Sequence, residues 1–219
     1  MNYKAIDLTH VLNEEVSVYP DTIGPKMEQL NTVLEHGYAE LQINMVLHSG
    51  THIDAPSHII NNGRTIDRFP LNKFYGKALR ISCLDIEEID LAFLLTFEEQ
   101  IRQVNFILFY TGWQDKWQKD GYIEDCPVLT EEAAIWLTEF KLDGVGLDAF
   151  SVDKVVDAEM ITALSLPNHH ILLGNEIPLI ENLTNMDKLP DDIFDFQCFP
   201  LKVEQGDGSP IRAVAFLKS

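Results

Sequence analysis

Alternating and uniformly apolar segments along the chain predict strands at several positions. Residues 3–9 alternate, and residues 26–47 hold two alternating runs around a His-Gly pair, which predicts a hairpin. Residues 76–84 predict a further strand. Residues 104–110 are apolar almost throughout, and residues 144–150 form a shorter apolar run, a pattern typical of strands covered on both faces. These segments indicate a sheet with buried central strands.

Helical segments lie between the predicted strands. Residues 85–103 fit a helix with an acidic start, and residues 130–140 open with Thr-Glu-Glu before apolar residues spaced for one helix face. Residues 192–203 and 211–217 predict a closing hairpin, with the polar segment between them as its turn. The order of elements predicts an α/β fold in a single domain over residues 1–219.

Composition restricts the possible partners of the chain. A length of 219 residues allows one domain with a sizeable core, and the formal net charge of −19 disfavours nucleic acid or an anionic membrane as partner. The three cysteines are far apart, which favours a reducing compartment over a disulfide framework. Without a secretory leader or an apolar run of about 18 residues, we expect a cytoplasmic protein.

Candidate chemistry is concentrated in residues 48–58, His-Ser-Gly-Thr-His-Ile-Asp-Ala-Pro-Ser-His, which hold three of the seven histidines. His48, His52 and Asp54 offer imidazole nitrogens and a carboxylate oxygen, a set that suits zinc, iron, cobalt or manganese and leaves a position for water. His58 is the candidate for proton transfer. The alternative, ordinary polar loop residues, accounts poorly for this density of ligand types.

The local geometry of this segment also follows from its residues. Gly50 and Pro56 disfavour a regular helix, so we expect a loop and a strand end. Side chains alternate in an extended chain, which places His52 and Asp54 on the same side. A turn at Ser49–Gly50 then folds His48 back toward them, and Pro56 stiffens the segment that carries His58.

The segment resembles the signature His-x-Gly-Thr-His-x-Asp-x-Pro-x-His of the cyclase family of metal-dependent hydrolases, which includes bacterial kynurenine formamidases and isatin hydrolases. Every fixed position of the signature is present. The resemblance continues in order through residues 146–153, 169–173 and 181–190. It therefore covers most of the chain.

The resemblance implies a swivelling β/β/α fold and a small-molecule substrate. It also implies that His169 and Glu181 complete a centre of one or two Zn²⁺ or Mn²⁺ ions, a second ion sharing Asp54 with the first. Without the resemblance, His169 reads as a core histidine. The resemblance further implies a homo-oligomer, a dimer or tetramer, with pockets near the subunit interfaces.

Two positions keep alternatives open. The loop of residues 19–25 lacks the glycine that the family usually carries after its Tyr-Pro pair, which leaves the substrate undecided. Tyr19 is a candidate substrate-binding wall, or a ring packed on its own proline turn. Asp148, at the end of a predicted strand, is a candidate support for the metal site or a carboxylate that caps a loop.

The predicted reaction is hydrolysis of a carbon-nitrogen or carbon-oxygen acyl bond by metal-activated water. The chain has no Gly-x-Ser-x-Gly elbow and no Gly-x-Gly-x-x-Gly loop, so serine hydrolase and dinucleotide functions lack their minimum features. The resemblance favours an N-formyl aromatic amine such as N-formylkynurenine as substrate. Ring opening of a cyclic amide or lactone is one alternative, and a catalytically silent, metal-bound assembly protein is another.

Overall fold

A mixed sheet forms the centre of the computed structural model, which describes residues 3–156, 162 and 165–218. In chain order its strands are β1 (Tyr3–Asp7), β4 (His52–Asp54), β5 (Tyr75–Ser82), β7 (Phe106–Tyr110), β9 (Gly144–Leu147), β10 (Leu179–Glu181), β11 (Phe194–Gln197), β12 (Gly208–Pro210) and β13 (Val214–Lys218). Within the described residues the nine strands lie in the order β1-β13-β11-β5-β7-β9-β10-β4-β12. Strands β5, β7, β9 and β10 are parallel to their neighbours in that series, and the remaining pairs are antiparallel.

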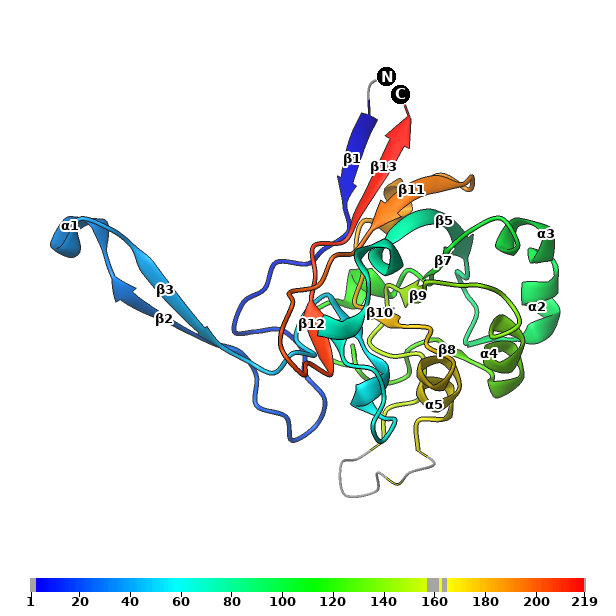
Figure 1. Ribbon diagram of the computed structural model, residues 1–219, viewed down its shortest axis with the longest axis horizontal. Helices are drawn as coiled ribbons and strands as arrows, with labels where there is room; N and C mark the ends of the chain where they lie inside the picture. Colours follow the sequence, from blue (N-terminus) through cyan, green and yellow to red (C-terminus); the bar gives the residue numbers. More distant parts are fainter. Residues whose placement is uncertain (1–2, 157–161, 163–164, 219) are drawn as a thin grey trace.

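Helices and short 3-10 turns complete the described residues. They are α2 (Leu91–Leu95), α3 (Glu98–Ile101), α4 (Glu131–Leu137), α5 (Pro167–Gly174), η1 (Pro56–His58), η2 (Ile66–Arg68), η3 (Leu71–Phe74), η4 (Trp113–Lys116) and η6 (Met186–Lys188). Helix α4 packs against both α2 and α5, and α5 contacts β10 (Figure 1). The arrangement is the predicted α/β class. Nowhere among the described residues is a helix both long and apolar enough to cross a bilayer.

Strand β7 lies in the middle of the sheet and is covered on both faces, as its apolar sequence predicts. Phe106 and Leu108 enter one hydrophobic cluster, and Ile107 and Phe109 enter the other, which includes the buried apolar residues of α2, α4 and α5. All four side chains are fully buried. Burial on both faces explains why this strand carries no alternating polar positions.

The predicted continuous helix over residues 85–103 is wrong. The chain first forms the short strand β6 (Glu88–Ile89), which pairs with β8 (Val128–Leu129), and helix begins only after Asp90 caps the amide of Phe93. Ile89 is buried, so this segment gains more from pairing and burial than from extending a helix. Local helical propensity is overridden by tertiary packing.

The predicted hairpin of residues 26–47 is present, and it forms an arm. Strands β2 (Lys26–Asn31) and β3 (Glu40–Asn44) are joined by a single helical turn, α1 (Val33–His36). Thr32 caps that turn and Gly37 ends it at a φ of 81°, a conformation that glycine adopts without strain. Figure 1 shows this arm, in blue, projecting away from the sheet and its helices.

The predicted closing hairpin is confirmed, but the segment between its strands is more than a turn. β11 and β13 pair antiparallel, whereas β12, between them in sequence, pairs with β4 at the opposite edge of the sheet. Gly208 makes this possible, since a Cβ there would lie 2.8 Å from the Cε1 atom of His48. The C-terminal segment thereby lies beside His48 and β4, which carry the candidate ligands of residues 48–58.

Candidate active site

Three predicted site residues come from two paired strands. In β4, His52 and Asp54 point to the same side, and the antiparallel register places Glu181 of β10 directly opposite His52. The Nε2 atom of His52 lies 3.2 Å from Oδ1 of Asp54 and 3.5 Å from Oε2 of Glu181. All three side chains are buried.

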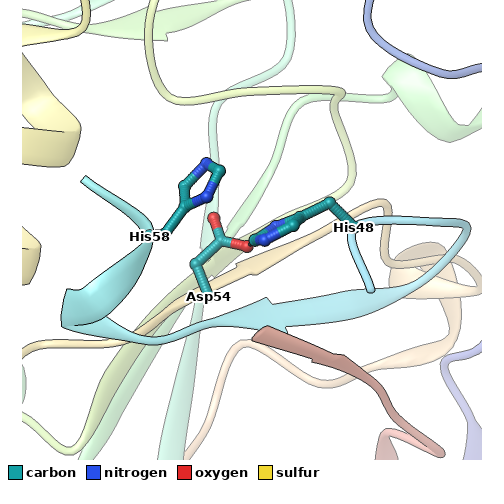
Figure 2. Close-up of side chains that lie close together, drawn as sticks. All are labelled: His48, Asp54 and His58. Atoms are coloured by element: carbon teal, nitrogen blue, oxygen red, sulfur yellow. The ribbon is translucent and has the colours of Figure 1, made fainter. Parts of the chain in front are cut away.

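The residues on either side of β4 bring two more imidazoles to Asp54 (Figure 2). Gly50, at a φ of 68°, turns the chain so that Nδ1 of His48 lies 2.6 Å from Oδ1 of Asp54. On the other side, Pro56 starts the 3-10 turn η1, which carries His58. The rings of His48 and His58 lie 3.9 Å apart between centroids. The turn at Gly50 and the strand geometry are those expected from the sequence.

His169, on helix α5, reaches the other side of the same carboxylates. Its Nε2 atom lies 3.6 Å from Oδ2 of Asp54 and 3.5 Å from Oε1 of Glu181. Each carboxylate therefore presents one oxygen to His52 and the other to His169. All five residues predicted as ligands thus lie around one buried centre.

The side chains of this centre provide donor atoms that suit divalent cations. Oε1 of Glu181 is buried and has no hydrogen-bond partner among the described residues, although a buried carboxylate oxygen normally has one. Imidazole nitrogens with carboxylate oxygens form a donor set suited to Zn²⁺ or Mn²⁺. The two shared carboxylates could hold two such ions.

Two hydrogen bonds fix which nitrogen faces the centre. Nδ1–H of His52 donates to the carbonyl oxygen of Gly50 at 2.8 Å, and Nδ1–H of His169 donates to Oδ2 of Asp153 at 2.7 Å. Asp153 also accepts from the amides of Asn168 and His169 at the start of α5. The Nε2 atoms are therefore directed toward the carboxylates. Metal-binding histidines in other proteins are oriented in the same way, by donating the other ring N–H to a carboxylate or a carbonyl oxygen.

Replacement of Asp153 is expected to weaken cation binding without removing a ligand. Asp153→Ala loses the acceptor for His169, so affinity for Zn²⁺ should fall by about 10- to 100-fold. Asp153→Asn keeps an acceptor oxygen for His169, so its affinity for Zn²⁺ should fall less than that of the alanine variant. Competition against a chromogenic chelator measures the Zn²⁺ affinity of each variant. Equal affinity of the alanine variant and the unmodified protein would show that Asp153 does not position His169.

The charges in this centre strongly affect one another. Burial alone would lower the pKa of His48, but the carboxylates of Asp54 and Asp207 outweigh it and raise that pKa to about 10. Burial would raise the pKa of Asp54, yet the neighbouring His48 and His52 hold it well below its usual range. A proton and a cation compete for the same imidazole nitrogens, so cation affinity should decrease as the pH falls.

Asp207 is a site residue that the sequence reasoning missed. Its Oδ2 atom lies 3.2 Å from Nε2 of His48 and 3.8 Å from Nδ1 of His58. The two neighbouring imidazoles of His48 and His58 hold the pKa of Asp207 far below its ordinary value. An aspartate between two glycines is typical of a turn, so no local signal indicated this position.

Tyr19 contacts residues outside its own turn. Its hydroxyl donates to the carbonyl oxygen of Val156 at 2.7 Å, and its ring centroid lies 6.4 Å from that of Phe150. The ring and the hydroxyl of Tyr19 thus have partners outside its own proline turn. A role for Tyr19 in substrate binding stays a prediction.

Asp148 caps a loop. Its carboxylate accepts from the amide and hydroxyl of Thr111 at 2.7 and 2.6 Å and from the amide of Gly112 at 2.9 Å. These bonds hold the turn after β7 beside a cavity of about 860 Å³, which Thr111 and Trp113 help to line. None of the five predicted ligands lines that cavity. Of the two alternatives for Asp148, the structure shows the loop cap.

Comparison with known proteins agrees with this architecture. The model of the cyclase family matches residues 6–154. A kynurenine formamidase of Geobacillus thermodenitrificans is 30% identical over 210 residues, which is 95% of each chain. Isatin hydrolase A from Labrenzia aggregata, solved with benzyl benzoate, is 26% identical with a TM-score of 0.85 over 99% of this chain and 94% of its own. A potential metal-dependent hydrolase with cyclase activity is 26% identical with a TM-score of 0.79 over both full chains. The chain belongs to the cyclase family.

Proposed function

We propose that this protein is a metal-dependent hydrolase of amide bonds next to an aromatic ring. The observation that carries the proposal is the placement of Asp54 and Glu181, each between two imidazoles, with His58 beside them at the solvent side. The side chain of His58 is 31% exposed, whereas that of Asp54 is 1% exposed. Four of the five proposed ligands are buried, and the side chain of His48 is 20% exposed. The candidate acid/base is the more exposed group and can reach a substrate.

The proposed ligands are His48, His52, Asp54, His169 and Glu181. A divalent cation held there supplies polarisation of a carbonyl oxygen and a water that is deprotonated near neutral pH. The chain supplies preorganisation, because burial and the bonds to Gly50 and Asp153 keep the Nε2 donors in place before substrate arrives.

His58 moves the protons of the reaction. The water oxygen adds to the carbonyl carbon, and His58 accepts the proton that the water loses. When the carbon-nitrogen bond breaks, His58 returns a proton to the leaving nitrogen, which departs as an amine. An imidazole suits both steps because it gains and loses a proton near neutral pH.

An aryl formamide such as N-formylkynurenine is the proposed substrate. The kynurenine formamidases, about 30% identical over nearly the whole chain, support this choice. The similarity to isatin hydrolase A supports a second candidate, ring opening of a cyclic aryl amide. Both reactions add water to an amide carbonyl whose nitrogen is attached to an aromatic ring. The choice between Zn²⁺ and Mn²⁺ stays open, because the donor set serves both.

A paired assay separates these candidates. Purified protein loaded with Zn²⁺, or separately with Mn²⁺, is incubated with N-formylkynurenine and with isatin, and product is followed by absorbance. We expect faster hydrolysis of N-formylkynurenine. Faster turnover of isatin would favour the second candidate, and inactivity on both substrates with both ions would contradict the proposal. A cytoplasmic location and a homo-oligomeric state stay predictions from the sequence.

A further inference from the structure

Asn182 lies directly after Glu181, where the pairing of β10 with β4 stops. The register places Glu181 opposite His52. A continued ladder would pair Asn182 with Thr51. Instead Asn182 adopts a φ of 58°, and its backbone amide donates to the carbonyl oxygen of Ala149 at 3.1 Å. The backbone of β10 therefore turns away from β4 at the residue that follows a candidate ligand.

Hydrogen bonds from two side chains replace the missing ladder bonds. The side-chain amide of Asn182 donates to the carbonyl oxygen of Gly50 at 3.0 Å. The hydroxyl of Thr51 donates to the carbonyl oxygen of Asn182 at 2.6 Å. Asn182 and Thr51 are 2% and 3% exposed, so water is not an alternative partner for either group. These two bonds hold the turn before β4 against the end of β10.

The carbonyl oxygen of Gly50 accepts two hydrogen bonds, one from Asn182 and one from Nδ1–H of His52 at 2.8 Å. A carbonyl oxygen has two lone pairs and can serve both donors. Gly50 has a φ of 68° and no side chain to restrain its peptide, so the bond from Asn182 supplies the restraint. The position of this oxygen sets the direction of Nδ1–H, and with it the direction in which Nε2 of His52 faces.

Tyr122 orients the side chain of Asn182. Its hydroxyl donates to Oδ1 of Asn182 at 2.7 Å. In a side-chain amide the oxygen accepts and the nitrogen donates, so this bond leaves the NH₂ group to face the carbonyl of Gly50. Tyr122 is 1% exposed and its ring is held among the core residues. The chain of contacts from Tyr122 to His52 is therefore buried throughout.

We propose that Asn182 is a positioning residue of the candidate centre. Its side-chain amide holds the carbonyl of Gly50, and that carbonyl holds the ring of His52 with Nε2 toward the carboxylates. The oxygen and nitrogen of its side chain are engaged by Tyr122 and Gly50, so Asn182 acts by placing His52 and not as a ligand. The inference rests on the proposed role of His52 as a cation ligand.

The test removes the side chain of Asn182 without straining the backbone. Asn182→Gly suits the φ of 58°, and Asn62→Gly is the matched control, because Asn62 has a φ of 59° and is exposed. In the cation-free protein, NMR should show the Nδ1 proton of His52 exchanging with water at least about fivefold faster in Asn182→Gly, a ratio typical of one net hydrogen bond. Zn²⁺ affinity should fall by about 10-fold. The control should change neither quantity.

A second substitution separates positioning from stability. Asn182→Gly leaves the buried hydroxyl of Tyr122 without its acceptor, which lowers the melting temperature. The double variant Asn182→Gly with Tyr122→Phe removes that unpaired hydroxyl, so its melting temperature should recover. Exchange of the His52 proton should stay fast and Zn²⁺ affinity should stay low. Tyr122→Phe alone keeps the ring and should shift both quantities in the same direction, which decides the question if the glycine variants fail to fold.

Two results would overturn the proposal. One is unchanged proton exchange and Zn²⁺ affinity in Asn182→Gly, or in Tyr122→Phe where the glycine variant does not fold. The other is recovery of Zn²⁺ affinity together with the melting temperature in the double variant, which would show that Asn182 acts only on stability. An unmodified protein that binds no Zn²⁺ would refute the proposed function instead, and exchange of the His52 proton would still decide whether Asn182 holds this ring.

Discussion

Replacing His58 with alanine is expected to reduce hydrolysis by about 100- to 10,000-fold while leaving the cation content unchanged. The ring of His58 lies beside that of His48, and the atoms of His58 and Asp54 that could bind a cation lie within 4.8 Å of each other. His52 and His169 both approach Asp54 and Glu181, so two imidazoles remain at these carboxylates when His58 is removed. The partly exposed His58 adds little to the core. Turnover of N-formylkynurenine, elemental analysis and the melting temperature should therefore separate proton transfer from folding.

The matched control for this variant is His36→Ala. His36 lies on the arm, 42% exposed, and takes no part in the site. It should keep full activity. If the His58 variant keeps full activity as well, His58 is not the acid/base, and if its cation is lost, His58 serves as a ligand. A silent metal-bound protein would show unchanged metal and stability with no hydrolysis in any form.

Replacing His52 with alanine is expected to have a still larger effect, through loss of the cation itself. His52 is buried and approaches both Asp54 and Glu181, so its removal takes a nitrogen donor from the centre and leaves two buried carboxylates with less compensation. Bound cation should fall from stoichiometric to near zero. Hydrolysis should fall below that of the His58 variant, because both carbonyl polarisation and water activation are lost.

Elemental analysis after dialysis measures this result directly, with His170→Ala on helix α5 as a control that changes an adjacent histidine outside the centre. Full cation occupancy in the His52 variant would refute its role as a ligand. Loss of cation in the His170 control would show that disturbance of the fold, and not removal of a donor, empties the site.

The local geometry of residues 48–58 could be predicted because its determinants are local. A glycine free to adopt a positive φ turns the chain at Gly50, alternation aligns His52 with Asp54, and Pro56 begins the turn that carries His58. Each of these rules acts within a few residues. The structure agrees with all of them.

The remote parts of the site could not be derived in the same way. Glu181 lies opposite His52 only because β10 pairs with β4, and His169 reaches Asp54 only because α5 packs on the sheet. Their inclusion rested on resemblance to the cyclase family. Asp207 had no such support, and its position depends on the pairing of β12 with β4, two segments more than a hundred residues apart.

The arm illustrates the opposite limit. Its strands and their register follow from alternation, yet alternation alone predicts that one face is buried against the rest of the same chain. In the structure that face projects into solvent. An alternating sequence pattern predicts that one face of a hairpin is buried against another surface. It does not show whether that surface belongs to the same chain.

The most direct test of the central claim is a titration of the cation-stripped protein with Zn²⁺ or Mn²⁺, following both bound ions per chain and the rate of N-formylkynurenine hydrolysis. We predict no hydrolysis in the stripped protein and a rate that rises with bound cation to a plateau at one or two ions per chain. Hydrolysis that is equally fast without bound cation, or stoichiometric binding with no hydrolysis of either N-formylkynurenine or isatin, would contradict the account.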